Sequence, residues 1–259
     1  MQKLSLTFIQ SELFWENKEV NVSHFSKLID DIKEQTDIII LPEMFSTGFT
    51  MNASILAERM DGPVVSWMKK IASSKKVAIC GSLIIEENNQ YFNRFIWAGI
   101  EGEIQFYDKR HLFRMADENN TYTSGQSKLL INYNGIKIFP VICYDLRFPV
   151  WLRRTKLFDY DLMIVVANWP ERRVHHWKTL LQARAIENQS FVAAVNRVGN
   201  DGNGFLYTGE SSLINPKGDI VFQHANESIT KTVTIDLNEV DEWRESFKAI
   251  EDADNFVFE

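Results

Sequence analysis

The chain has 259 residues, a formal net charge of −7, 45% apolar and 24% charged residues. This composition is that of an ordinary globular protein with a sizeable core, and it argues against intrinsic disorder. The acidic balance argues against a nucleic-acid partner, which would require a basic stripe. We see no apolar run of membrane-spanning length and no signal-peptide pattern, so we expect a cytoplasmic protein without a membrane partner.

Strands and helices alternate in the first half of the chain. Polar and apolar residues alternate over Lys3–Gln10, which predicts a strand, and helical spacing predicts a helix over Asn17–Glu34. The further expected elements are a buried strand at Asp37–Pro42, a helix at Pro63–Ser74, and strands at Val77–Ile85, Tyr91–Ile100 and Glu103–Asp108. The polar segment Arg110–Lys128 shows no periodicity and predicts a long loop near a site.

The second half repeats this alternation and ends in an acidic, aromatic tail. Its expected elements are strands at Ile136–Ile142, Asp161–Asn168, Phe191–Asn196, Phe205–Asn215, Gly218–His224 and Lys231–Asp236, helices at Pro149–Phe158 and His175–Asn188, and a turn at Asn200–Gly204. We expect one α/β layered domain over residues 1–259. The tail from Leu237 is expected to pack on the body or across a dimer.

Three predicted strands are each followed by an ionisable residue. These are Glu43 after DIIILP, Lys109 after EIQFYD and Cys143 after IKIFPVI. Strand ends of an open α/β sheet meet at one edge, where ligands bind. A thiol, a carboxylate and an ammonium brought together could supply a nucleophile, a base and a stabiliser of oxyanion charge. Lys109 is also expected to favour the Cys143 thiolate.

Each of these residues also has an ordinary structural interpretation. A single cysteine in a strand is usually an inert buried thiol, and Cys80, the only other cysteine, is interpreted in that way. Glu43 could cap a strand end, and Lys109 could be a solvated charge. The occurrence of all three at strand ends is what favours chemistry. Both cysteines lie in apolar runs, so no disulfide is expected.

The segments around these residues resemble signature segments of the nitrilase superfamily of carbon–nitrogen hydrolases. The segments are LPEMFSTGF, YDKRHLF and CYDLRFP, in the order of that family, followed by VVANWP, HWKTLLQARAIENQ and YTGESSLINPKG. Within the superfamily, the chain looks most similar to the omega-amidase-like branch. The resemblance implies a four-layer α-β-β-α sandwich, usually paired into a homodimer.

The resemblance also implies residue roles. Cys143 would be the nucleophile and Glu43 the general base, while Lys109 and the backbone N–H of Tyr144 would hold the oxyanion. Glu118 matches the family's second glutamate and would orient the substrate amide or Lys109. No cofactor or metal is expected, and adjacent His175 and His176 would point apart on a helix rather than chelate.

A small keto acid amide carries a carboxylate that must be anchored. Arg147 is the first choice because a guanidinium binds a carboxylate through two hydrogen bonds, although a salt bridge with Asp145 or another acid is the structural alternative. Arg172 and Arg173 are the second choice, with a solvated charge pair as the alternative. Aromatic residues that could wall the pocket are Phe45, Phe49 and Trp169.

The function expected is hydrolysis of the terminal amide of a small α-keto acid amide, such as 2-oxoglutaramate, through a thioester. A sister activity on N-carbamoyl amino acids, nitriles or a deaminated dipeptide-like metabolite is the alternative within enzymes, because the same three residues serve all of them. A catalytically silent binding module is the alternative from another class. The intact set of Glu43, Lys109 and Cys143 argues against the binding module.

Overall fold

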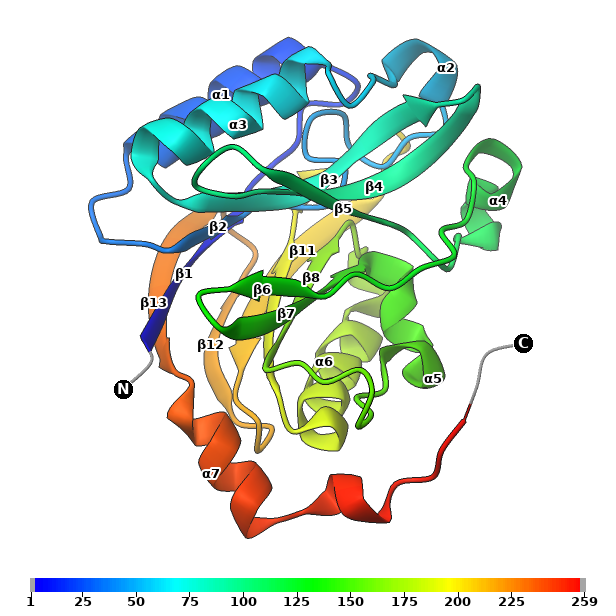
Figure 1. Ribbon diagram of the computed structural model, residues 1–259. Coiled ribbons are helices and arrows are strands. Elements are labelled where there is room, and N and C mark those ends of the chain that lie inside the picture. The colour runs from blue at the N-terminus through cyan, green and yellow to red at the C-terminus, as the bar shows by residue number, and fades with distance from the viewer. Residues whose placement is uncertain (1–2, 257–259) are drawn as a thin grey trace.

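The computed structural model describes residues 3–256 and contains two β-sheets that face each other (Figure 1). The first sheet has six strands in the order β13-β1-β2-β3-β4-β5. Their bounds are β1 Lys3–Gln10, β2 Ile38–Ile40, β3 Ala78–Glu87, β4 Gln90–Ala98, β5 Ile104–Asp108 and β13 Ile229–Asp236. Strands β1, β2 and β3 run parallel, whereas β13, β4 and β5 pair antiparallel with their neighbours.

The second sheet has seven strands in the order β10-β11-β9-β8-β7-β6, with β12 paired to β11. Their bounds are β6 Ile131–Tyr133, β7 Ile136–Ile142, β8 Leu162–Ala167, β9 Phe191–Asn196, β10 Val198–Asn200, β11 Leu206–Ile214 and β12 Ile220–Ala225. Its centre, β7-β8-β9, is parallel. These strands are buried along their length, which is why they read as continuous apolar runs rather than alternating ones.

Helices cover the outer face of each sheet, so the layers follow the order α-β-β-α. Helices α1 (Lys18–Asp30) and α3 (Pro63–Lys75) lie together over the first sheet, and α6 (Val174–Asn188) lies against the second (Figure 1). The main core fills the space between the sheets, where Phe8 of β1 contacts Phe222 of β12 at a centroid distance of 5.4 Å. The sandwich expected from the sequence is confirmed.

Alternate residues of one short strand serve two different cores. In β2, Ile38 and Ile40 face the core between the sheets, whereas Ile39 faces the core beneath α1 and α3. Every side chain of the strand is therefore buried, and its apolar run ends where the chain leaves the sheet. Glu43 follows three residues later, still completely buried.

Several predicted boundaries differ from the structure. The helix expected over Pro149–Phe158 is only one turn, α5 (Pro149–Leu152), because the backbone N–H of Arg154 donates to Asn188 instead of continuing the helix. The segment expected to be a loop contains η1 (Arg114–Ala116) and α4 (Glu118–Thr121). The sequence pattern did not predict α2 (Ala53–Leu56), β6 or β10, which are short.

The chain after the last strand begins with α7 (Asn238–Ser246) and continues into η4 (Ala249–Asp252). Arg244 of α7 donates to Asp161 at 3.0 Å and to the carbonyl of Gln189 at 3.0 Å. These contacts attach α7 to the segments that precede β8 and β9. Among residues 3–256, every helix is too short or too polar to cross a membrane.

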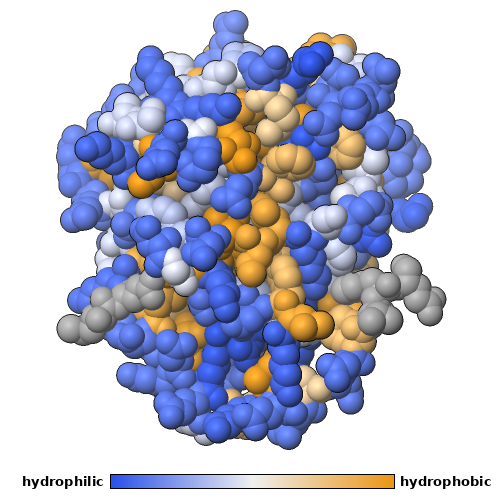
Figure 2. Space-filling model, in the orientation of Figure 1, coloured by the Kyte–Doolittle hydropathy of each residue, from blue (hydrophilic) through white to orange (hydrophobic). Residues whose placement is uncertain are grey.

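Apolar side chains form a band down the middle of the face shown in Figure 2. The edge strands of both sheets, β5 and β6, lie on this side in Figure 1. Phe106 of β5 and Leu130, just before β6, are among the exposed apolar residues.

Candidate active site

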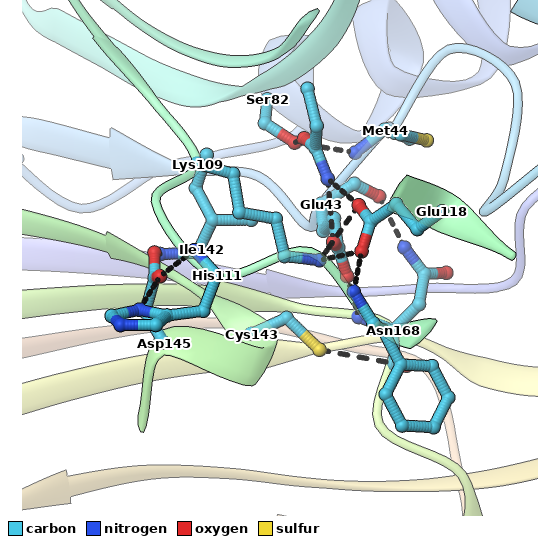
Figure 3. Close-up of polar contacts among 12 residues, drawn as sticks. Glu43, Met44, Ser82, Lys109, His111, Glu118, Ile142, Cys143, Asp145 and Asn168 are labelled. Carbon is cyan, nitrogen blue, oxygen red and sulfur yellow. Dashed lines mark hydrogen bonds and ion pairs between the residues drawn. The ribbon is translucent and has the colours of Figure 1, made fainter. Parts of the chain in front are cut away.

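Glu43, Lys109 and Cys143 meet between the two sheets (Figure 3). Glu43 follows β2 and Lys109 follows β5, both of the first sheet, whereas Cys143 follows β7 of the second. The expected meeting at the edge of one sheet is therefore wrong. The residues converge because the two sheets face each other across the main core.

Lys109 lies between two carboxylates. Its Nζ donates to Glu43 Oε1 at 2.9 Å and to both oxygens of Glu118 at 2.9 and 3.0 Å. All three side chains are buried, with Lys109 only 1% exposed. A buried ammonium between two carboxylates stays charged only if its hydrogen bonds are made, and this geometry makes them.

Burial and pairing oppose each other in the pKa of Lys109. Burial alone would lower the pKa, but the Glu118 and Glu43 carboxylates outweigh it, and the net direction is upward. Burial raises the pKa of Glu118, and the nearby Glu43 carboxylate adds to this increase, while Lys109 opposes it. The lysine is therefore a permanent cation, and protons are exchanged by the acidic groups around it.

Cys143 is held in a strained backbone conformation at the start of η2 (Cys143–Arg147). Its φ is +44°, in the left-handed region that costs a residue with a side chain about 1–3 kcal/mol. The thiol is 9% exposed and its Sγ lies 3.8 Å from the carbonyl oxygen of Asn168. Figure 3 shows the thiol beside the carbonyl of Asn168 and near the Glu43–Lys109 pair.

The resting form of Cys143 is a thiol. Burial raises its pKa well above the ordinary value, and the Glu43 carboxylate raises it further, whereas Lys109 lowers it. The expected effect of Lys109 is present, but burial and Glu43 outweigh it. Attack by this cysteine therefore requires a base that takes the proton as the bond forms, and Glu43 is the adjacent carboxylate. Cys80, by contrast, is buried in β3 within the core, and burial raises its pKa.

Two asparagines hold Glu43, and the sequence analysis missed both. Asn93 donates to Glu43 at 2.8 Å and to Glu118 at 3.2 Å, and its own oxygen accepts from Ser82 at 2.8 Å. The backbone N–H of Asn168 donates to Glu43 at 2.7 Å, and its side-chain nitrogen donates to the Glu43 carbonyl at 2.6 Å.

A sequence signal for both asparagines existed. Asn93 interrupts an apolar strand, YFNRFIW, and Asn168 is a further polar residue at a strand end. The Oδ1 atom of Asn168 has no hydrogen-bond partner among residues 3–256, although the residue is only 5% exposed. Asn168 also lines the cavity that contains Cys143.

The cavity at this site has a volume of about 440 Å³. Its walls include the nucleophile candidate, Lys109 and most of the predicted substrate contacts, which are Arg147, Arg172, Arg173, Phe49 and Trp169, together with Tyr144. Tyr144 lies in the first turn of η2, where backbone N–H groups have no acceptor inside the helix. Phe49 lies below Lys109, whose Nζ is 5.2 Å from the ring centroid.

Phe45 does not line this cavity, so its predicted role as a pocket wall is corrected. Its side chain is completely buried in the core beneath α1 and α3, where it packs edge-on against Phe25 at 5.5 Å. Phe45 lies two residues beyond Glu43, but Met44 between them has a φ of +43° and redirects the chain. Proximity in sequence to Glu43 was therefore a poor guide to the direction of this ring.

Asp145 does not pair with Arg147, which was the structural alternative expected for this arginine. Its carboxylate accepts from His111 and from the Tyr107 hydroxyl at 2.8 Å, and it is completely buried. Arg147 instead donates to His176 Nδ1 at 3.1 Å and stacks over Trp169 at 4.7 Å. A structural salt bridge between Arg147 and Asp145 is thus absent from the described residues, and the guanidinium faces the cavity.

Comparisons with known proteins identify the family of this chain. A family model described as carbon-nitrogen hydrolase matches residues 5–245. The chain is 44% identical over 257 residues to the omega-amidase YafV of Escherichia coli K12, covering 99% of both chains. It is 34% identical over 253 residues to a 2-oxoglutaramate amidase of Bacillus subtilis, covering 96% of this chain and 97% of the relative.

A solved structure from Xanthomonas campestris superimposes over the full length of both chains. That protein, XC1258, is described as a CN-hydrolase superfamily protein with an arsenic adduct in its active site; it shares 41% identity with a TM-score of 0.97. The match extends through both sheets and therefore includes every segment that forms the site. The chain belongs to the carbon-nitrogen hydrolase family.

Proposed function

We propose that this protein is an omega-amidase, which hydrolyses the terminal amide of a small α-keto acid amide such as 2-oxoglutaramate to the acid and ammonia. The observation that carries the proposal is the buried Glu43–Lys109–Glu118 cluster beside Cys143, because Lys109 and Cys143 line a cavity with arginines in its wall. Relatives that match nearly the whole chain are named omega-amidase and 2-oxoglutaramate amidase.

In the first half of the reaction, Cys143 Sγ attacks the amide carbon while Glu43 accepts the thiol proton. The raised pKa of Cys143 supports this order, because a preformed thiolate is disfavoured in the buried site. Lys109 Nζ and the Tyr144 N–H hold the oxyanion of the tetrahedral intermediate. The C–N bond then breaks, Glu43 passes its proton to the departing nitrogen, and ammonia leaves a thioester on Cys143.

In the second half, Glu43 removes a proton from water as the water oxygen attacks the thioester carbon. The same donors hold the second oxyanion. When the C–S bond breaks, the proton held by Glu43 returns to the sulfur, and the carboxylic acid departs. Glu118 supports both halves by keeping Lys109 charged and fixed, since it binds the ammonium through both oxygens.

The substrate carboxylate is assigned to Arg147, with Arg172 and Arg173 as the other candidates. Arg147 is only partly exposed and is fixed between His176 and the Trp169 ring, so its donors are held in place before the substrate arrives. Phe49 and Trp169 supply apolar walls for the carbon chain.

We also propose that the protein works in the cytoplasm as a homodimer. The apolar band of Figure 2 supports the binding of a second copy on that face. Light scattering, which measures the molar mass in solution, tests this oligomeric state.

The test is turnover by the purified protein. It is given 2-oxoglutaramate, a simple nitrile and an N-carbamoyl amino acid, and ammonia release is followed for each, with Cys143→Ala as the control. We expect 2-oxoglutaramate to have the highest kcat/KM and the variant to release no ammonia. Turnover of another compound without turnover of 2-oxoglutaramate would refute the proposed substrate.

A further inference from the structure

Three arginines in the cavity wall have no carboxylate partner in the part of the chain that the structure describes. Five other arginines form ion pairs, namely Arg59, Arg94, Arg154, Arg184 and Arg244. Among residues 3–256, no ion pair involves Arg147, Arg172 or Arg173, although all three line the cavity that contains Cys143. Unpaired guanidinium groups gathered at one cavity are suited to bind anions.

Each of the three guanidinium groups is fixed by an aromatic ring of the same cavity. Arg147 lies 4.7 Å from the centroid of Trp169, Arg172 lies 4.4 Å from that of Phe205, and Arg173 lies 5.1 Å from that of Phe113. Stacking orients the planar group and leaves its N–H donors at the edges free for a ligand. The cluster is therefore organised before any ligand binds.

The arginines are close enough to repel one another. Burial, together with the charges of Arg172 and Arg147, lowers the pKa of Arg173, while the nearby Cys143 opposes this. This repulsion disfavours the cluster in the empty site and is relieved when anions enter. Arg173 and Arg147 are half-buried near the nucleophile, whereas Arg172 is exposed at the outer wall.

Among residues 3–256, the acidic residues of the cavity form no ion pair with this cluster. Asp201 is occupied by the Tyr207 hydroxyl at 2.9 Å and by the backbone N–H groups of Asn203 and Phe205. Glu16 accepts from Thr50 and Asn52, and Asp117 accepts from Asn120. The hydrogen bonds of each carboxylate therefore go to groups other than the three guanidinium groups, which stay open to anions.

One α-keto acid amide carries a single carboxylate, whereas three separately stacked guanidinium groups line the cavity. A volume of about 440 Å³ is also in the range of cavities that take larger ligands than a five-carbon acid. We infer that the site prefers amides whose acyl part carries two anionic groups, one bound by Arg147 and Arg173 near the nucleophile, and the other by Arg172 at the outer wall. This inference rests on the proposed amidase function.

The test compares two amides that differ only in the second charge. N-succinyl-L-glutamine and N-butanoyl-L-glutamine have the same side-chain amide and the same four-carbon acyl length, but only the first has an outer carboxylate. We expect kcat/KM to be at least about tenfold higher for the succinyl compound, because a factor of this size corresponds to one additional charge-assisted hydrogen bond. Arg172→Gln should bring the ratio of the two values close to one.

Arg114→Gln is the matched control, because Arg114 is exposed beside the cavity but does not line it. It should leave the ratio unchanged. Equal kcat/KM values for the two amides would overturn the inference, and so would a ratio that Arg172→Gln does not alter. In either case, turnover of 2-oxoglutaramate would still support the proposed amidase function. If all three arginines bind one carboxylate together, Arg172→Gln will reduce kcat/KM equally for both amides, which also overturns it. Absence of ammonia release from all amides, 2-oxoglutaramate included, would reject both proposals.

Discussion

Asp145 binds His111 at two points. One carboxylate oxygen accepts the backbone N–H of His111 at 2.9 Å and contacts its ring Nδ1 at 2.8 Å. Asp145 lies two residues after Cys143, and His111 lies two residues after Lys109. The contact therefore joins the segment of the thiol to the segment of the ammonium, which come from opposite sheets (Figure 3).

This contact makes Asp145 a positioning residue, and Asp145→Asn tests it. The variant keeps the side-chain shape but weakens the charge-assisted hydrogen bonds from His111 and Tyr107. We expect kcat to fall roughly 10- to 100-fold through misalignment of Cys143 and Lys109, with little change in KM. Asp159→Asn removes a carboxylate that pairs with Arg154 away from the cavity, and it should keep kcat. A loss of stability without a loss of kcat would show that Asp145 is only structural.

Replacing the two cysteines should separate chemistry from packing. Cys143→Ala should abolish ammonia release and leave thermal unfolding nearly unchanged, because the thiol borders a cavity and its backbone is strained. Cys80→Ala should retain activity and lose about 0.5–3 kcal/mol of unfolding free energy, since it removes a buried atom from the core. Activity assays and denaturant unfolding of both variants measure the contrast; an active Cys143→Ala variant would remove this residue from the mechanism.

The pH dependence of alkylation should reveal the protonation state of Cys143. An unfolded cysteine loses its proton near pH 8.5 or so, whereas burial and Glu43 raise the pKa of folded Cys143 well above its usual range. Only the thiolate reacts, so the rate of alkylation by iodoacetamide should still rise about tenfold per pH unit beyond pH ~9. A plateau below pH ~8 would indicate a preformed thiolate instead.

The raised pKa of Cys143 also makes the stability of the protein depend on pH. The folded protein keeps the thiol proton where the unfolded chain has released it, so the unfolded state binds fewer protons above about pH 8.5. The stability that the buried thiol contributes is therefore present below that pH and decreases as the pH rises. Denaturant unfolding at pH 7 and pH 10, compared between the native chain and Cys143→Ala, should show a smaller decrease in the variant.

Phe45 and Phe49 form a natural pair for testing the limits of the pocket. Phe45→Leu should lower the unfolding free energy by about 0.5–3 kcal/mol, because the smaller side chain leaves a cavity in the core against Phe25, and it should leave KM unchanged. Phe49→Leu should raise KM with a smaller effect on stability, since this ring lines the cavity beneath Lys109. Steady-state kinetics and denaturant unfolding of both variants test this assignment of Phe45 to the core and Phe49 to the cavity wall. A raised KM for Phe45→Leu together with an unchanged KM for Phe49→Leu would contradict it.

The sequence by itself determined the identity of most elements and the ionisable residues of the site. Apolar runs marked the buried strands β2, β7 and β8, and the polar residue after each run marked where the chain leaves the sheet. These features are local, because the hydrophobic period of an element depends only on which of its faces is buried. The motifs around Glu43, Lys109 and Cys143 also indicated the family.

Only the tertiary structure decided how these elements meet. It brought Lys109 and Cys143 together from facing sheets, turned Phe45 into the core and placed Asn93 and Asn168 on Glu43. It also left three cavity arginines without acidic partners among residues 3–256. Each of these outcomes depends on contacts between residues distant in the chain. Local periodicity specifies which side of a strand is buried, but the neighbour across the core is chosen by the packing of the two sheets.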